Sequence, residues 1–304
     1  MGAVDGAPAG MDADERSRLM ARASGRHVPA REVRWILDDV ASDPGTASSP
    51  GARAERFDRL VGRRASGEPL QYVLGRWPFR SVELTVDPRV LIPRPETEHV
   101  VTVALAELAA DPAVGADGAV CVDLGTGSGA IALSLAVEAR EVAGVPALEV
   151  WASDRSAAAL EVASANLAAL STVVAGAGAR VHLVTGSWYA ALPGGLVGRV
   201  DLLVSNPPYV AEDEIAGLDP GVREWEPVSA LVAPDGASGI GGMADIEAIV
   251  AGAPPWLRPG GALVVEIAPH QAGAAADAAR RAGLAGVRIE RDLAGRSRML
   301  VARR

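Results

Sequence analysis

Residues 119–133 read AVCVDLGTGSGAIAL, a stretch that predicts a buried strand, a glycine loop and the start of a helix. Gly125, Gly127 and Gly129 allow the chain to turn tightly and to bring its backbone against a ligand. A helix beginning at Ala130 adds free backbone N–H groups at the same place. Because Ala130 can stand for the third glycine of G-x-G-x-x-G/A, the stretch satisfies the fingerprint of dinucleotide-binding folds, although a purely structural turn also fits these residues.

Strands and helices alternate from residue 119 to the end of the chain. The expected strands are AVCVDL, EVWAS, RVHLV, VDLLVS, ALVVEIA, VRIERDL and RMLVAR, and the expected helices cover about residues 130–140, 156–170, 243–253 and 272–282. Such alternation indicates a mainly parallel sheet with helices on both faces. We therefore expect an α/β fold with a Rossmann-like, doubly wound sheet.

The beginning of the chain has a different pattern. Apolar residues recur at helical spacing from Asp14 to about Val40 and from Arg53 to about Ala65, on either side of a Pro/Gly/Ser-rich loop over residues 43–51. Residues 1–12 are rich in glycine, alanine and aspartate, which is typical of a loose tail. We predict three parts: a helical domain over residues 1–76, a β-hairpin-like linker over 77–93 and the α/β domain over 94–304.

Composition excludes several classes of protein. All 29 basic residues are arginine, so the chain has no lysine for Schiff-base chemistry or for a P-loop. One cysteine and four scattered histidines predict neither an internal disulfide nor a metal site. The net charge of −9 disfavours nucleic acid as a partner. The acidic N-terminus and the lack of a long apolar run predict a cytoplasmic protein that does not bind membranes.

Two aspartates flank the glycine loop in the expected fold. Asp154 ends the second strand, 29 residues after Gly125, where its carboxylate could accept hydrogen bonds from ribose hydroxyls or cap the next helix. This spacing exceeds the roughly 20 residues typical of a nicotinamide site. Asp123 precedes the glycines, where a negative charge disfavours a pyrophosphate and favours a cationic ligand. S-adenosylmethionine, which carries an ammonium and a sulfonium group, is such a ligand.

The most specific motif is Asn206-Pro207-Pro208-Tyr209, directly after the strand VDLLVS. With two Asn and three Tyr in the chain, its chance occurrence is roughly 10⁻⁴, so a plain turn is the weaker interpretation. A planar NH₂ group is a poor nucleophile, and two acceptors that hold its hydrogens can aim its lone pair at a methyl donor. The side-chain oxygen of Asn206 and the carbonyl of Pro207 are suited to this, the Pro-Pro pair stiffens the loop, and Tyr209 could pack on the target group.

These motifs together resemble the HemK/PrmC-type family, the N5-glutamine methyltransferases of class 1 peptide chain release factors. The resemblance covers about residues 67–304. It rests on GEPLQYVLG (67–75), LIPRPETE (91–98), DLGTGSGAIAL (123–133), SNPPY (205–209), EP (226–227) and DLAGRSR (292–298). It implies a class I S-adenosylmethionine-dependent fold with a small helical domain at the N-terminus that helps to seat the protein substrate, and we expect a monomer.

The resemblance also implies roles for individual residues. Asp123, Gly125, Thr126, Gly127, Ser128, Gly129 and Asp154 would bind the cofactor together with Asn206, and Trp188 would lie against its adenine. Asn206, Pro207, Pro208 and Tyr209 would hold the substrate glutamine of a Gly-Gly-Gln motif, with Asn206, Pro207 and Tyr209 acting in catalysis. Two positions depart from the family pattern: Ala268 replaces a glycine, and Ser187 stands where aspartate is common.

Three other functions stay open at this point. An N6-adenine methyltransferase would use the same Asn-Pro-Pro-Tyr chemistry, but acting on duplex DNA requires a phosphate-binding surface that the net charge disfavours. A non-catalytic module that binds a translation factor could share the fold, because fold does not determine function. A nicotinamide oxidoreductase is disfavoured by Asp123 and by the spacing to Asp154.

Overall fold

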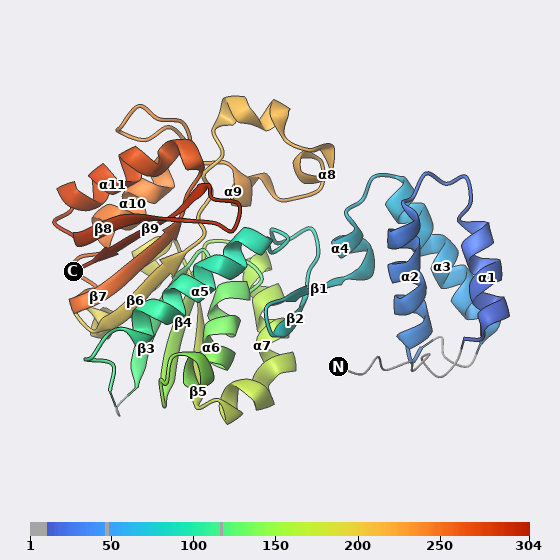
Figure 1. Cartoon of the computed structure of the whole chain (residues 1–304), viewed down its shortest axis with the longest axis horizontal. Helices are drawn as coiled ribbons and strands as arrows, with labels where there is room; N and C mark the ends of the chain where they lie inside the picture. The colour runs from blue at the N-terminus through green and yellow to red at the C-terminus, as the bar shows by residue number, and fades with distance from the viewer. Residues whose placement is uncertain (1–10, 46–48, 116–117) are drawn as a thin grey trace. The chain divides into compact units, whose positions relative to one another are not determined.

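The structure is a computed structural model that describes residues 11–45, 49–115 and 118–304 (Figure 1). Most of the tail predicted over residues 1–12 lies outside the described residues. Of its last two residues, Met11 is buried in the helical core, and Asp12 accepts a hydrogen bond from the backbone N–H of Glu15 at 2.7 Å. Asp12 therefore caps the first helix and Met11 packs into the helical core, so these two residues are not part of a tail.

The described chain divides into two compact units. The first reaches Gly75 and also contains the segment Asp219–Trp225, which sequence reasoning assigned to the α/β domain. Its helices are α1 (Ala13–Arg22), α2 (Ala30–Ser42), α3 (Pro50–Ala65), α4 (Leu70–Leu74) and α8 (Pro220–Arg223). Trp225 packs close to Gly67 in the helical unit, since its Nε1 lies 4.0 Å from the position that a Cβ on Gly67 would take. This packing is one reason why the segment Asp219–Trp225 belongs to that unit.

The helical unit has its own core. Ile36, Val40 and Phe57 are fully buried in a cluster that α1, α2, α3 and α4 share. The helical pattern predicted from Asp14 to Val40 is interrupted between α1 and α2, because Gly25 adopts a positive φ of 81° and Pro29 cannot continue a helix.

The second unit contains a seven-stranded sheet in the order β5-β4-β3-β6-β7-β9-β8. The strands are β3 (Ala119–Leu124), β4 (Leu148–Asp154), β5 (Ala179–Thr185), β6 (Val200–Ser205), β7 (Leu257–Glu266), β8 (Ala285–Arg291) and β9 (Ser297–Arg303). Pairing is parallel from β5 to β7, and β9 runs antiparallel to both of its neighbours. The predicted α/β, Rossmann-like fold is confirmed.

Helices cover both faces of this sheet (Figure 1). One core cluster joins the sheet to α5 (Pro95–Ala109), α6 (Ala130–Val142) and α7 (Ala157–Gly176), and a second joins it to α10 (Ala244–Gly252) and α11 (Ala272–Arg281). Every residue of β6 is buried as a result, which explains its nearly continuous apolar sequence. The remaining short elements are α9 (Val228–Leu231), η1 (Trp188–Ala191), η2 (Gly194–Leu196), η3 (Glu212–Gly217) and η4 (Pro269–Gln271).

The predicted hairpin-like segment forms an antiparallel pair, β1 (Arg76–Phe79) and β2 (Val82–Thr85), that belongs to the second unit. Phe79, Val82 and Leu84 are buried in the same cluster as α5 and α6. Asn166 of α7 holds the end of β2, since it accepts from the Thr85 N–H at 2.7 Å and donates to the Thr85 carbonyl at 3.1 Å. The hairpin is therefore packed into the α/β unit and is not a free linker.

Among the described residues, α7 is the one helix that is long and apolar enough, by length and composition alone, to cross a membrane. Ala159, Val162 and Ala163 of this helix are buried, and Asn166 is a buried polar residue within it. Helices that cover a sheet pass the same test, so this finding is weak evidence for a membrane span.

Asn166 also donates to the Ser128 carbonyl at 2.9 Å, so one amide joins the hairpin, α7 and the glycine loop. We predict that Asn166→Leu lowers the free energy of unfolding by about 3 kcal/mol, because buried backbone groups lose their partners. Chemical denaturation measures this loss, with the exposed Ser171→Ala on the same helix as the control. Equal stability of the two variants would contradict the assigned role of Asn166.

Candidate functional site

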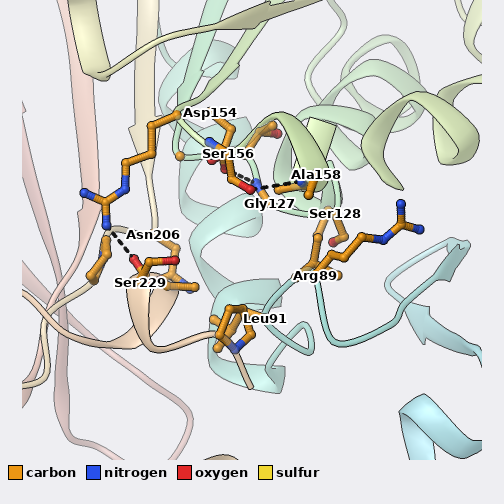
Figure 2. A pocket seen from close by; sticks show the side chains of 18 of the residues that line it. Arg89, Leu91, Gly127, Ser128, Asp154, Ser156, Ala158, Asn206 and Ser229 are labelled. Carbon is orange, nitrogen blue, oxygen red and sulfur yellow. Dashed lines mark hydrogen bonds between the residues drawn. The ribbon is translucent and has the colours of Figure 1, made fainter. Parts of the chain in front are cut away.

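A cavity of about 290 Å³ opens where β3, β4 and β6 end. The residues after these strands include Gly125 after β3 and Asn206 after β6, and Asp154 is the last residue of β4. Because β3 pairs with both β4 and β6, the three carboxyl ends meet at one edge of the sheet. The Asn-Pro-Pro-Tyr motif and the glycine loop therefore follow neighbouring strands. In Figure 2, Asn206 and Ser229 line one side of this cavity, and Arg89 and Ser128 line the other.

The glycine loop requires its glycines. Gly125, Gly127 and Gly129 have φ values of 76°, 55° and 85°, a region that residues with a Cβ adopt at a cost. A Cβ on Gly125 would lie 3.2 Å from Cζ3 of Trp188, so the indole ring covers this part of the loop. Trp188 lines the cavity.

Asp154 holds the loop in place. One of its carboxylate oxygens accepts from the Gly127 N–H at 2.9 Å, and the other accepts from the Ser156 N–H at 2.8 Å at the start of α7 (Figure 2). The helix cap itself is Ser156, whose hydroxyl accepts from the Ala159 N–H. Asp154 therefore positions the loop and also lines the cavity.

Asp123 lies beneath the loop and is fully buried. One oxygen accepts from the Thr126 hydroxyl at 2.6 Å and from the Ala132 N–H at 3.2 Å, while the other has no partner among the described residues. Burial disfavours the charged form and raises the pKa of Asp123 to about 7. Asp123 therefore supports the loop from below and does not line the cavity.

This raised pKa predicts a pH-dependent stability. The native pKa of about 7 lies above the ordinary value of 3.8, so the stability that Asp123 contributes is lost as the pH rises through that interval. Asn at this position cannot ionise. We predict that thermal unfolding of the ligand-free protein shifts in favour of Asp123→Asn between pH 4.5 and pH 8, by about 3 kcal/mol. Parallel pH profiles for the two proteins would contradict this.

Asn206 belongs to a chain of hydrogen bonds. Its Nδ2 donates to Oγ1 of Thr97 at 3.1 Å, and Thr97 donates to Oε2 of Glu266 at 2.8 Å. The Tyr209 hydroxyl donates to Oε1 of the same carboxylate at 3.1 Å. No described residue donates to Oδ1 of Asn206, and Asn206 lines the cavity. An amide oxygen is thus available as an acceptor at the cavity wall.

The carboxylate in this chain is buried, since Glu266 is 1% exposed. Burial raises the pKa of Glu266, and the hydroxyls of Thr97 and Tyr209 and the charge of Arg298 oppose that rise. Burial and the charge of Glu266 raise the pKa of Tyr209 above its ordinary value, so Tyr209 keeps its proton.

The structure gathers most of the predicted site residues, but not all of them. Those that line the cavity are Gly125, Thr126, Gly127, Ser128, Asp154, Trp188, Asn206 and Pro208. Those outside its lining are Asp123, Gly129, Pro207 and Tyr209. Tyr209 instead borders an open depression on another side of the loop, together with Ala268 and His270. Ala268 has φ −74° and ψ 149°, ordinary extended backbone, so its methyl group causes no backbone strain.

Sequence reasoning assigned no role to Thr97, Glu226 or Glu266. Thr97 lies within the motif LIPRPETE and Glu226 within the motif EP, but the distance in sequence between these motifs and their partners gives no indication that the side chains make contact. Glu226 is buried and pairs with Arg94 while it accepts from the Ile92 N–H at 3.1 Å. It therefore ties the segment before α5 to Pro227, and both border the cavity.

Comparison with known proteins identifies the family. The family model "Methyltransferase small domain" matches residues 103–217, and "PrmC N-terminal domain" matches residues 46–75. A release factor glutamine methyltransferase of Cereibacter sphaeroides is 40% identical over 288 residues, which cover 92% of this chain and 93% of that protein. This chain belongs to the release factor glutamine methyltransferase family.

Two further relatives in the family have the same extent of similarity. The Bordetella pertussis protein is 42% identical over 93% of both chains, and the Gloeobacter violaceus protein is 38% identical over 94% of both. Both are named release factor glutamine methyltransferase. Membership confirms the resemblance predicted from the motifs, and the chain is a methyltransferase. The non-catalytic module and the oxidoreductase considered above are wrong.

Proposed function

We propose that this chain transfers a methyl group from S-adenosylmethionine to the side-chain amide nitrogen, N5, of the glutamine in the Gly-Gly-Gln motif of class 1 peptide chain release factors. Family membership supports the reaction class. The observation that carries the proposal is the acceptor oxygen of Asn206 on the same cavity wall as the glycine loop. An acceptor there suits a substrate that presents an NH₂ group.

The residues of the cavity fit the proposed cofactor. The backbone of Gly125, Thr126, Gly127, Ser128 and Gly129 forms a cradle with no side chain at its glycines, and the unpartnered oxygen of the buried Asp123 beneath it favours a cation. Trp188 offers a flat apolar face for the adenine, and Asp154 offers carboxylate oxygens to ribose hydroxyls. S-adenosylmethionine, when bound, supplies a methyl group activated by its positively charged sulfur.

The chain's own residues would orient the glutamine. Oδ1 of Asn206 and the carbonyl of Pro207 would accept the two hydrogens of the amide, so that its lone pair faces the methyl donor. Pro207 and Pro208 restrict the loop, which keeps these acceptors in place before the substrate arrives. Pro208, which lines the cavity, would complete the substrate contacts, and Tyr209 would hold the loop through its bond to Glu266. After the methyl group is transferred, the nitrogen releases one proton.

The domain roles are part of the same proposal. We assign substrate recognition to the predicted helical domain, residues 1–76, and catalysis to the α/β unit, which includes the segment predicted as a linker over residues 77–93 as well as residues 94–304. The match of residues 46–75 to an N-terminal domain model of this family supports that division. The protein acts in the cytoplasm as a monomer, without direct binding to nucleic acid or to membranes.

Mass spectrometry of release factor incubated with this protein and S-adenosylmethionine tests the function. We expect a gain of one methyl on the Gly-Gly-Gln glutamine, and a loss of at least about 100-fold in turnover for Asn206→Ala, because a positioned polar group at the reacting atom is removed. Cofactor affinity should fall far less than turnover, because the glycine loop, Asp154 and Trp188 remain in place. Near wild-type turnover of Asn206→Ala would overturn the mechanism, and methylation of nucleic acid instead of protein would favour the adenine methyltransferase.

The cradle makes a separate prediction. A Cβ on Gly125 meets Trp188, so we expect Gly125→Ala to weaken S-adenosylmethionine binding by at least about tenfold in calorimetry. Gly144→Ala is the matched control, since Gly144 also has a positive φ but a Cβ there meets no atom within 4 Å. Unchanged affinity in Gly125→Ala would argue against the assigned cofactor site.

A further inference from the structure

We propose that Thr97 and Glu266 are positioning residues that set which way the Asn206 amide faces, and that they do so through the direction of one hydrogen-bond chain. The inference rests on the proposed function for its catalytic consequence. The chain runs from Nδ2 of Asn206 to Oγ1 of Thr97 and from Thr97 to Oε2 of Glu266.

The direction of this chain follows from the groups in it. Both oxygens of Glu266 accept hydroxyl hydrogens, one from Thr97 and one from Tyr209, so the carboxylate needs no proton of its own. Thr97 has a single hydroxyl hydrogen, and that hydrogen goes to Glu266. The Thr97 hydroxyl can therefore only accept a hydrogen bond from Asn206. This requires the NH₂ group of the Asn206 amide, and not its oxygen, to face Thr97.

The opposite orientation of the Asn206 amide would remove the acceptor from the cavity wall. If Thr97 donated to Asn206, Oδ1 would face Thr97 and the NH₂ group would face the cavity. Two sets of N–H donors, from Asn206 and from a substrate amide, would then oppose each other, which costs binding and orientation. An acceptor-only group at the end of the chain prevents this.

The fold explains how the three residues meet. Asn206 follows β6, Glu266 is the last residue of β7, and the paired residues before them, Ser205 and Val265, are directly in register. Thr97 reaches them from the first turn of α5, 109 residues from Asn206 and 169 from Glu266 in sequence. The chain of bonds is thus created by strand pairing and helix packing.

The same carboxylate also anchors the other end of the Asn-Pro-Pro-Tyr loop. Tyr209 donates to Oε1 of Glu266, and its carbonyl accepts from Nε2 of Gln271 at 2.9 Å. Both ends of a stiff Pro-Pro segment are therefore tied to one buried group, which fixes the loop as well as the amide.

A nitrogen–proton correlation spectrum of the ligand-free full-length protein tests the orientation without any substrate. The chain has two Asn and two Gln, so the spectrum holds few side-chain NH₂ signals, and the pair lost in Asn206→Ala identifies Asn206. We expect that pair to shift in Thr97→Val, which lacks the hydroxyl, and in Glu266→Gln, which can donate toward Thr97. It should stay in place in Thr97→Ser, which keeps the hydroxyl. Unchanged Asn206 signals in Thr97→Val would overturn the proposal.

Turnover of release factor provides the second readout. We expect Thr97→Val and Glu266→Gln to lower kcat by at least about tenfold with S-adenosylmethionine affinity unchanged, and Thr97→Ser to stay within about threefold of wild type. Equal kcat in Thr97→Val and wild type would also overturn the proposal. If wild type itself methylates no release factor, the proposed function fails, while the spectrum still decides the orientation. Thermal unfolding shows whether Thr97→Val or Glu266→Gln fails to fold. If one of them does, the other is used for the test.

Discussion

The site depends on the parallel pairing of β3 with β4 on one side and with β6 on the other. Parallel strands present their carboxyl ends at the same edge. The chain runs outward from β3 through β4 to β5 and then crosses to β6 on the other side of β3, so a crevice opens where the strand order reverses. The glycine loop, Asp154 and Asn206 each follow or end one of these strands. Without this pairing, residues that are 81 positions apart, such as Gly125 and Asn206, would share no cavity.

Buried carboxylates hold the loops around that crevice. Asp123 lies under the glycine loop, Glu226 holds the segment before α5, and Glu266 joins Thr97 to Tyr209. Removing a carboxylate from water is costly, and backbone or hydroxyl donors in fixed positions offset that cost. Each group therefore works only in the folded chain, where it restricts a loop that has little regular structure of its own.

Local patterns predicted much of the architecture. Periodicity and glycine placement identified the helical part, the strands of the α/β part and the loop after β3, because these depend on residues close in sequence. The helical pattern overlooked the break at Gly25, where positive φ ends a helix, and the alternation at residues 77–93 did not reveal that Phe79 and Leu84 enter the core of the α/β unit. Local patterns also could not assign Asp219–Trp225 to the helical unit, because that assignment depends on packing between residues far apart in sequence.

The sequence by itself determined the fold class, the family and the chemistry available at two loops, because glycines with special backbone angles and an Asn-Pro-Pro-Tyr motif act through residue type and short spacing. Only the tertiary structure decided that Asp123 supports the loop from beneath, that Tyr209 bonds to Glu266 instead of lining the cavity, and that Thr97 takes the Asn206 amide by its nitrogen. Those outcomes depend on strand register and on a helix start more than a hundred residues away, and no local pattern encodes such distances.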